Sequence, residues 1–285
     1  AFADKFGFRK AYGSYEEMLS DPEVQLVYIT TPHSHHCEQI LLCLEHGKHV
    51  ICEKAFTVNA RQAKQVFETA KAKGLYVAEA IWTRYMPSRK MIQDVIDSGI
   101  IGNLNVVTAN LSYKIDYKER LVDPNLAGGA LLDVGIYGLS FALTHFGWDI
   151  DRIGSSVQLT ESGVDGMETI TIFYKDGRMA VLTHGIYGRS DRKGIFYGET
   201  GYIVVENINN PQSVSVYNDR DELLECYEVP KQVNGYEYEF AEAVRCIQEG
   251  KYQPDAISLE ESVRTMELMD SLRREWGIVY PREQE

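Results

Sequence analysis

Hydrophobic and polar positions follow two different patterns along the chain, and the pattern changes near residue 82. The first part contains three nearly continuous apolar runs, at Val24–Thr30, Val50–Cys52 and Leu75–Ile81. Such runs predict strands covered on both faces, as in a parallel sheet. Between them, apolar residues recur at helical spacing over 36–46 and 59–73, and a glycine follows each stretch. Alternating strands and helices predict a parallel α/β sheet over residues 1–82.

After residue 82 the chain is predicted to form an α+β domain over residues 83–285. Alternating and β-branched runs between residues 152 and 228, separated by turn residues, predict a large, open, mostly antiparallel sheet. The sheet begins with a further β-like stretch from Leu104. Helical spacing predicts helices at Pro87–Ser98, Leu131–Phe146, Tyr236–Gln248 and Ser258–Trp276.

Composition and charge exclude several classes of function. The 285 residues carry a formal net charge of -13, so a nucleic-acid partner, which requires a basic footprint, is not expected. An anionic membrane surface would repel the chain, and no uninterrupted apolar run reaches the ~18 residues of a transmembrane helix. Five cysteines without a CxxC motif are typical of free thiols in a reducing cytosol, which predicts a cytoplasmic protein.

Polar residues follow each of the three predicted parallel strands. They are Thr30–His33, Glu53–Lys54 and the stretch from Glu79 to Arg84. In open parallel sheets, ligands bind beyond the carboxyl ends of the strands. Three polar strand ends at one edge therefore predict a binding crevice.

Several of these residues also have simpler interpretations. Lys54 could be a solvated strand end, and Asp133 and Tyr137, four residues apart, could make an ordinary contact on one helix face. Trp82 could fill the core instead of lining a pocket. A histidine cluster with Cys37 suggests a metal, but ligands so close in sequence cannot all point inward, so no metal site is predicted. His36 near a phosphate, or capping its helix, is the better interpretation.

Four motifs in order along the chain resemble the glucose-fructose oxidoreductase / inositol dehydrogenase (Gfo/Idh/MocA) family. They are TPHSHH (31–36), GKHVICEKAFTVNA (47–60), EAIWTRYMP (79–87) and AGGALLDVGIY (127–137). The resemblance covers essentially the whole chain. It is strongest to the dimeric dihydrodiol dehydrogenase (D-xylose dehydrogenase) branch, because Tyr137 stands where many relatives have His.

The resemblance implies a Rossmann-type NAD(P)-binding domain and a C-terminal domain that binds substrate and forms a homodimer through its sheet. Such an enzyme would transfer a hydride between NAD or NADP, with NADP slightly favoured, and a CH–OH or C=O carbon of a small-molecule sugar or cyclic diol. Lys54 would be the acid–base group, with Asp133 and Tyr137 beside it in the catalytic site. Trp82, Asp133 and Tyr137 would line the substrate pocket. The cofactor would be bound along Thr31, Pro32, His33, His36, Glu53, Lys54 and Arg84.

This assignment is consistent with elementary chemistry. Oxidising an alcohol carbon requires that the hydroxyl proton be removed, and the reverse reaction requires that an oxygen receive one, while the nicotinamide carries the hydride. Lys54 is the first choice for the proton-transfer group and Tyr137 the second. Asp133, one helical turn from Tyr137, could orient either the substrate or Lys54.

The sequence departs from the family at its start. No GxGxxG turn occurs, and the chain begins as if inside the helix after the family's second strand. If the protein itself lacks this segment, it is expected to bind NAD(P) weakly or not at all, and the part that separates NAD from NADP is not in this sequence. The alternative predictions are a non-catalytic sugar- or nucleotide-binding regulatory relative that kept the fold and lost the chemistry, or a truncated fragment deficient in cofactor.

Two further expectations concern single positions. Ala55 replaces the proline that the family has after Lys54, and a cis bond before a residue other than proline costs ~2.5–4 kcal/mol, so a trans bond is expected. Ile170, Ile172 and Tyr174 share one face of a predicted strand, and they are predicted to form an apolar patch at the dimer interface.

Overall fold

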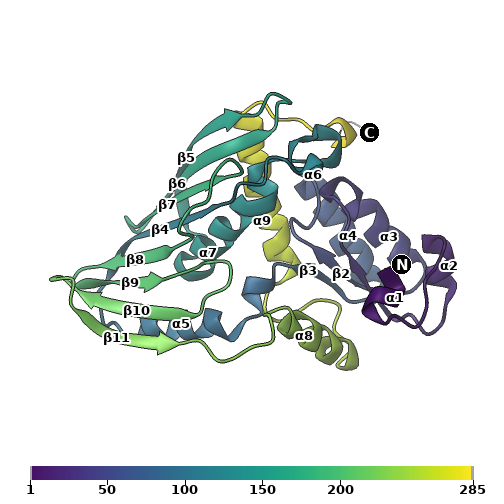
Figure 1. Cartoon of the computed structure of the whole chain (residues 1–285), viewed down its shortest axis with the longest axis horizontal. Coiled ribbons are helices and arrows are strands. Elements are labelled where there is room, and N and C mark those ends of the chain that lie inside the picture. The colour runs from purple at the N-terminus through teal and green to yellow at the C-terminus, as the bar shows by residue number, and fades with distance from the viewer. Residues whose placement is uncertain (1, 284–285) are drawn as a thin grey trace.

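The structure is a computed structural model that describes residues 2–283, and it contains two sheets with helices packed between and around them (Figure 1). The first sheet and its helices come from the first eighty residues. Their elements are α1 (Phe2–Phe6), α2 (Tyr15–Ser20), β1 (Leu26–Ile29), α3 (His36–Glu45), β2 (His49–Glu53), α4 (Ala60–Lys73) and β3 (Val77–Ala80).

The first sheet is parallel, with strand order β1-β2-β3, as predicted. Val50 in the central strand pairs with Val27 on one side and Val77 on the other. Both faces are covered: Val50 belongs to the main core that includes residues of α3 and α4, whereas Ile51 packs with Ala243 of α8 (Glu237–Gln248). Strands buried on both faces explain the continuous apolar runs.

Local signals set the ends of the helices around this sheet. The side chain of Asn59 accepts a hydrogen bond from the backbone N–H of Gln62 and starts α4, and Gly74 ends it in the left-handed conformation at φ 63°. Ser258 and Glu261 form a reciprocal capping box at the start of α9 (Leu259–Glu275). Helix starts at 59–60 and 258–259 were therefore readable from the sequence.

The second sheet is large, open and mostly antiparallel, as predicted. Its order is β11-β10-β9-β8-β4-β7-β6-β5, and only β4 and β7 are parallel neighbours. The strands are β4 (Leu104–Ser112), β5 (Ile150–Leu159), β6 (Asp165–Tyr174), β7 (Met179–Gly185), β8 (Gly194–Gly198), β9 (Gly201–Val205), β10 (Ser213–Asn218) and β11 (Leu223–Glu228). The other helices of this part are α5 (Pro87–Asp97), α6 (Glu119–Val122) and α7 (Ile136–Phe146). Helix α7 contacts β4 and β7 and covers the inner face of the sheet.

The buried helix of this region begins differently from the prediction. Leu131–Gly135 forms a π-helical turn, and α7 continues from Ile136. The stretch Pro124–Phe146 is long and apolar enough to cross a membrane by composition, yet 89% of its most apolar window is buried inside the protein. It is therefore the core helix of this region.

The expected apolar patch on β6 was assigned to the wrong face. Ile170 and Ile172 are fully buried, and the ring of Tyr174 packs edge-on against Phe146 of α7. Alternate residues of a strand point to opposite faces, so the outer face of β6 carries residues such as Thr171 and Phe173. The alternation was correct, but the sequence did not indicate which face α7 would cover.

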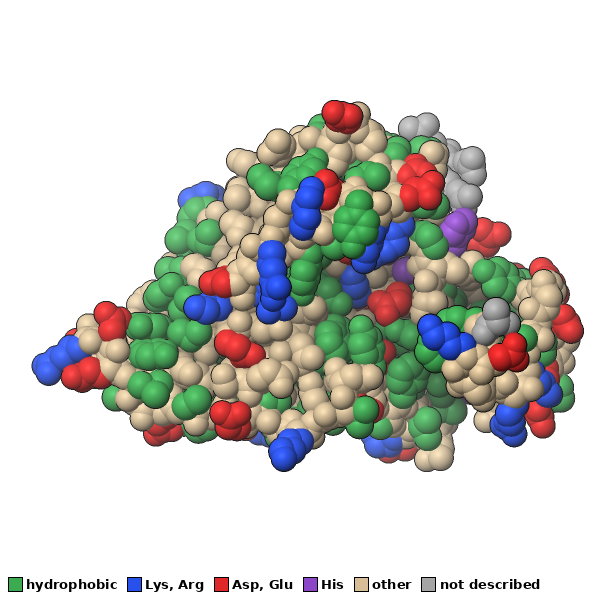
Figure 2. Space-filling model, in the orientation of Figure 1, with side chains coloured by type: hydrophobic (Ala, Val, Ile, Leu, Met, Phe, Trp, Pro, Cys, Tyr) green, Lys and Arg blue, Asp and Glu red, His purple; other side chains and the backbone are tan. Residues whose placement is uncertain are grey.

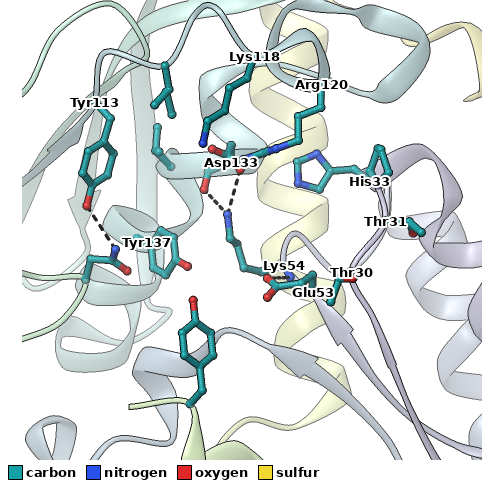
Figure 3. Close-up of a pocket in the computed structure, with 15 residues that line it drawn as sticks. Thr30, Thr31, His33, Glu53, Lys54, Tyr113, Lys118, Arg120, Asp133 and Tyr137 are labelled. Carbon is teal, nitrogen blue, oxygen red and sulfur yellow. Dashed lines mark hydrogen bonds and ion pairs between the residues drawn. The ribbon is translucent and has the colours of Figure 1, made fainter. Parts of the chain in front are cut away.

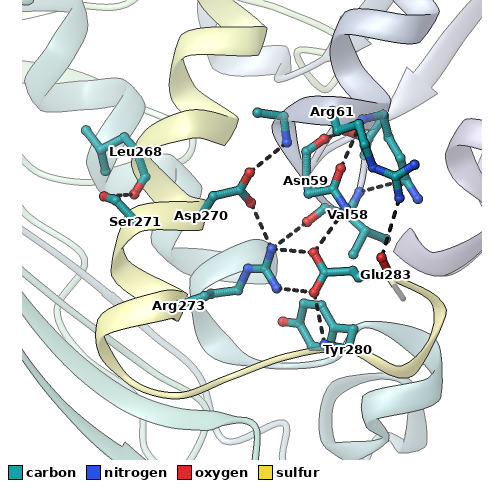
Figure 4. Close-up of polar contacts among 12 residues, drawn as sticks. Val58, Asn59, Arg61, Leu268, Asp270, Ser271, Arg273, Tyr280 and Glu283 are labelled. Atoms are coloured by element: carbon teal, nitrogen blue, oxygen red, sulfur yellow. Dashed lines mark hydrogen bonds and ion pairs between the residues drawn. The ribbon is translucent and has the colours of Figure 1, made fainter. Parts of the chain in front are cut away.

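Helix α9 connects the two parts of the molecule through Arg273 (Figure 4). This buried guanidinium donates hydrogen bonds to the Val58 carbonyl at 3.1 Å and to carboxylate oxygens of Asp270 at 2.8 Å and Glu283 at 2.7 Å. The adjacent Tyr280 hydroxyl donates to the Gly128 carbonyl at 2.6 Å. The chain after β2, the C-terminal helix and the segment before the π-helical turn are therefore held together.

Candidate active site

A cavity of about 570 Å³ lies between the carboxyl ends of β1 and β2 and the π-helical turn before α7. Figure 2 shows this hollow between the two parts of the molecule, with acidic, basic and histidine side chains on its wall. Its volume is typical of a small-molecule site. The lining residues are Thr30, Thr31, Pro32, His33, Glu53, Lys54, Tyr113, Ile115, Lys118, Arg120, Asp133, Val134, Tyr137, Asn209 and Tyr236.

Lys54 points from the end of β2 toward the π-helical turn (Figure 3). Its ammonium donates to the backbone carbonyl of Asp133 at 2.5 Å and to the Oδ1 atom of Asp133 at 3.2 Å. It also lies 5.0 Å from the centre of the Tyr137 ring, within range of a cation–π contact. The predicted trio of Lys54, Asp133 and Tyr137 is therefore brought together from segments about 80 residues apart in sequence.

Asp133 accepts from two cations. Its Oδ1 atom receives the Lys54 ammonium and also Nη1 of Arg120 at 2.8 Å, and its side chain is 9% exposed. Burial alone would raise the pKa of this carboxyl, but the charges of Lys54 and Arg120 outweigh it and hold the pKa below its usual range. Asp133 is therefore a carboxylate at neutral pH.

The Tyr137 hydroxyl is oriented by a tryptophan. Nε1 of Trp82 donates to it at 3.1 Å and also to Oδ1 of Asn209 at 3.1 Å, while the Trp82 ring stacks on Tyr236 at 4.4 Å. Burial raises the pKa of the Tyr137 phenol well above its usual range. Tyr137 therefore keeps its proton and can donate a hydrogen bond into the cavity.

The residues after β1 form the opposite wall. His33 is buried, and its Nδ1 atom donates to the carbonyl of Ala127 at 2.9 Å. Burial, together with the positive charges of its neighbours, lowers the pKa of His33 to about 3, so the ring is neutral. Glu53 accepts a hydrogen bond from the Tyr28 hydroxyl, which anchors its carboxylate at the edge of the cavity.

Three predicted site residues do not line this cavity. His36 is fully buried, and its ring nitrogens lie 2.9 Å from the carbonyl oxygens of Thr31 and Ala55, so it supports the loop from behind. Arg84 turns away and pairs with Glu261 at the start of α9 at 3.0 Å. Trp82 is buried behind Tyr137 and acts through its hydrogen bond.

The peptide bond between Lys54 and Ala55 is cis, so the expectation of a trans bond was wrong. Contacts on both sides hold this loop. The Ala55 carbonyl faces the His36 ring, and the next N–H, of Phe56, donates to the buried carboxylate of Glu79 at 3.1 Å. The sequence-based expectation considered only the local cost of a cis peptide bond and could not include these tertiary contacts.

Several residues that line the cavity were not predicted from the sequence. Three of them lie in the segment after β4 that includes α6: Tyr113, Lys118 and Arg120. Two others lie in the loops after β9 and β11: Asn209 and Tyr236. Tyr236 lies in the stretch GYEYEF (235–240), which the family resemblance also covers and which could have drawn attention to it. The others have no local signal, because only the folding of the large sheet brings them to the cavity.

Two parts of the chain match known families. Residues 1–80 match the family described as "Oxidoreductase family, NAD-binding Rossmann fold", and residues 90–204 match the "GFO/IDH/MocA C-terminal domain". The two matches correspond to the two sheets of the structure.

Curated relatives match over nearly the whole chain. Trans-1,2-dihydrobenzene-1,2-diol dehydrogenase of Mus musculus is 32% identical over 293 residues, which cover 99% of this chain and 86% of that protein. D-xylose 1-dehydrogenase (NADP(+)) of Hypocrea jecorina is 34% identical over 309 residues, covering 95% of this chain and 78% of the relative.

Solved structures agree with these matches. A 3-ketoreductase from Actinomadura kijaniata, in complex with NADP and TDP-benzene, superposes with a TM-score of 0.87 at 26% identity over 96% of this chain and 84% of that chain. Levoglucosan dehydrogenase, at 18% identity and a TM-score of 0.80 over 96% of this chain and 84% of its own, shows the same fold. The fold, the two family matches and the relatives agree, and the chain belongs to the Gfo/Idh/MocA family of NAD(P)-binding oxidoreductases.

Proposed function

We propose that this chain interconverts a hydroxyl and a carbonyl on a small sugar or cyclic diol, with Lys54 as the acid–base group. The names of the relatives support this substrate class, since they include a dihydrodiol dehydrogenase and a xylose dehydrogenase. The cavity of about 570 Å³ accommodates a substrate of that size beside a nicotinamide ring.

The observation that carries the proposal is the arrangement around Lys54. An ammonium has three N–H donors, and two of them bond to the carbonyl and the carboxylate of Asp133. Within residues 2–283 the Lys54 ammonium donates a hydrogen bond to no other acceptor. Lys54 also lines the cavity. The third N–H is therefore available to a substrate oxygen, which can exchange a proton with Lys54 as the carbon is oxidised or reduced.

Tyr137 and Asp133 act differently from Lys54. Because Tyr137 keeps its proton and already accepts a hydrogen bond from Trp82, it donates to the same substrate oxygen. Asp133 stays ionised and orients the Lys54 ammonium. This division assigns proton transfer to Lys54 and positioning of the substrate oxygen to Tyr137.

The residues at the carboxyl ends of β1 and β2 fit the nicotinamide end of NADP. Thr31, Pro32 and Glu53 line the side of the cavity opposite Tyr137, where Lys54 and a substrate carbon would face the ring. When bound, the nicotinamide supplies or accepts the hydride. NADP is favoured over NAD because the xylose dehydrogenase is named for it and the ketoreductase is solved with it.

A substrate panel tests the reaction. We expect turnover of D-xylose or trans-dihydrobenzenediol with NADP⁺. We expect kcat to fall by ~10²–10⁴ in Lys54→Met, because the proton-transfer group is lost. Lys54→Arg should be equally impaired, since a guanidinium does not release its proton. Lys114→Met is the matched control, because Lys114 is exposed and pairs with Asp116 outside the cavity.

Two results would contradict the proposal. An active and well-folded Lys54→Met enzyme would remove Lys54 from its role. Binding of NADP without turnover of any diol or pentose would favour a non-catalytic regulatory relative instead.

We also propose a homodimer through the outer face of the large sheet. Cross-strand neighbours on that face form a row of five β-branched side chains, which are partly exposed and not covered by any helix among the described residues. The row is Thr171, Val181, Thr108, Ile195 and Val204. A second copy of the chain would bury this face.

Light scattering tests the dimer. The wild-type protein should give twice the mass of 32.4 kDa, and Val181→Glu, which places a charge on this face, should give the monomer. A wild-type monomer at working concentration would contradict the dimer.

A further inference from the structure

Three buried polar side chains lie directly behind the π-helical turn that carries Asp133. Asp165 and Glu168 come from β6 and His184 from β7, and their exposed fractions are 0%, 3% and 2%. Oδ2 of Asp165 accepts a hydrogen bond from the backbone N–H of Leu131 at 2.5 Å. Nδ1 of His184 lies 3.1 Å from Oε1 of Glu168. This cluster, named the rear triad below, therefore contacts the first residue of the turn.

The turn sits on the rear triad with no space between them. A Cβ atom at Gly135 would lie 2.4 Å from Oε1 of Glu168, and one at Gly138 would lie 2.0 Å from Nε2 of His184. Real Cβ atoms essentially never approach other atoms closer than 3.0 Å. Glycine is therefore required at both positions, and the rear triad sets how deeply the turn and the start of α7 are seated.

The rear triad holds protons in place of counter-ions. Burial raises the pKa of Glu168 to about 7, and burial together with Glu168 raises the pKa of Asp165 well above its usual range. Burial lowers the pKa of His184 to about 3, so that ring is neutral. Oδ1 of Asp165 and Oε2 of Glu168 have no hydrogen-bond partner among the described residues, and the Asp165 carboxyl is close enough to Glu168 to share its proton with that side chain.

A further titratable group close to the rear triad is Tyr280, from the C-terminal segment. Its hydroxyl donates to the Gly128 carbonyl, three residues before Leu131. Tyr280 is itself packed against Arg273, whose guanidinium lies 4.6 Å from the Tyr280 ring. The segment before the turn is therefore fixed independently of Asp165.

We propose that Asp165, Glu168 and His184 are positioning residues for the reaction. Asp165 accepts a hydrogen bond from the N–H of Leu131, where the turn begins. The turn carries Asp133, whose carbonyl and carboxylate both accept hydrogen bonds from Lys54. The rear triad thus fixes the orientation of the Lys54 ammonium without touching the substrate. This inference rests on the proposed role of Lys54.

Two substitutions of Asp165 separate positioning from general stability. Asp165→Ala removes the acceptor for the Leu131 N–H, and we expect kcat to fall roughly 10–100-fold while the KM for substrate and the Kd of NADP change less than about threefold. Asp165→Asn keeps an acceptor for Leu131 and offers an amide donor to Glu168, so it should retain kcat within about threefold. Asp165→Ser, which is polar but too short to reach Leu131, replaces Asp165→Ala if that variant does not fold.

Ile172→Ala is the matched control, because Ile172 is fully buried on the same strand, seven residues after Asp165. It should lower Tm and leave kcat unchanged. The proposal is overturned if Asp165→Ala keeps the wild-type kcat, if Asp165→Asn is as impaired as Asp165→Ala, or if Ile172→Ala loses kcat equally.

A structural measurement distinguishes this proposal from the role of Lys54. In a crystal structure of Asp165→Ala, the contacts of 2.5 and 3.2 Å between Lys54 and Asp133 should be lost, and in Asp165→Asn they should persist. Unchanged contacts in Asp165→Ala would reject the positioning role even if Lys54 is the acid–base group. Lost contacts with an active Lys54→Met enzyme would instead reject the role of Lys54.

Discussion

Two polar clusters lie on opposite sides of the turn at Leu131–Gly135, and the aspartates in them differ in protonation state: Asp133 is ionised and Asp165 is protonated. On the cavity side, Asp133 accepts from Lys54 and Arg120, and its pKa is held below the usual range although burial opposes this. On the buried side, the neighbours of Asp165 are Glu168 and a neutral His184, and its pKa is raised by burial and by Glu168. Two aspartates on either side of one turn therefore differ: Asp133 is an anion, whereas Asp165 keeps its proton.

The difference follows from what each carboxyl can reach. A buried carboxylate is stable only when cations or N–H donors compensate its lost hydration, and the two cations beside Asp133 provide this. Among residues 2–283 no cation bonds to the rear triad, and the single N–H of Leu131 does not outweigh burial, so Asp165 keeps its proton and the triad serves as a rigid support. On the cavity side of the turn, the charge of Asp133 orients Lys54 for the reaction. On the buried side, the rear triad only supports the turn.

When the same change is made in both clusters, the larger effect is expected on the cavity side, where the charge is removed. Asp133→Asn leaves Lys54 with the backbone carbonyl but without the carboxylate, and we expect kcat to fall by roughly 10–100-fold, because a charge-assisted hydrogen bond contributes ~1.5–3 kcal/mol. The same change at the rear, Asp165→Asn, should cost less than about threefold. Steady-state kinetics of the two variants compare the clusters directly, and equal losses would show that charge is not what separates them.

An intermediate effect is expected when the fit between the turn and the rear triad is disturbed. Gly138→Ala places a methyl group where Nε2 of His184 lies, and overpacking of this kind costs ~1–3 kcal/mol. Thermal unfolding should show Tm lowered by roughly 3–8 °C. Gly188→Ala is the control, since nothing lies within 4 Å of a Cβ atom there; equal Tm values for the two variants would mean that the turn is not seated on His184.

The smallest effect concerns the pH dependence of stability. Glu168 has a pKa of about 7 in the folded protein and ~4.3 when unfolded. Because its folded pKa is raised, its contribution to stability is present below pH ~4.3 and is lost as pH rises to about 7. Glu168→Gln removes this loss.

Tm should therefore fall less between pH 5 and pH 7.5 in Glu168→Gln than in the wild type, by roughly 2–4 °C. The groups that face Glu168 are Asp165, His184 and Tyr280, and they are unchanged in the comparison. Parallel Tm–pH curves for the two proteins would show that Glu168 does not hold a proton in the folded state.

The residues on the cavity side of the turn could be predicted from the sequence better than those of the rear triad. Lys54, Asp133 and Tyr137 stand in motifs that resemble a family, and the structure brings them to one cavity. His36, Trp82 and Arg84 stand in the same motifs but lie behind the cavity or away from it. A motif identifies a segment that approaches the site, and packing decides which of its side chains face the cavity.

The rear side had no sequence signal. Glu168 and His184 sit at alternating positions that place them on the inner face, which is normally occupied by apolar residues. Asp165 lies at the start of β6, where it and Gly166 are both buried and the alternation does not hold. The close approach of Gly135 and Gly138 is a contact between segments some 30 to 45 residues apart, so neither local propensity nor spacing could predict it. The same limit explains why Ile170 and Ile172 were assigned to the outer face.

By itself the sequence determined the two sheets, the helix ends with capping residues, and the segments that carry the site. These depend on hydrophobic period, on hydrogen bonds between near neighbours, and on motifs, all of which are local along the chain. Tertiary structure alone decided the face of β6 that is buried, the cis bond after Lys54 and the charge states of Asp133 and Asp165. Each of these depends on which distant groups lie within a few ångströms, and that information exists only once the chain is folded.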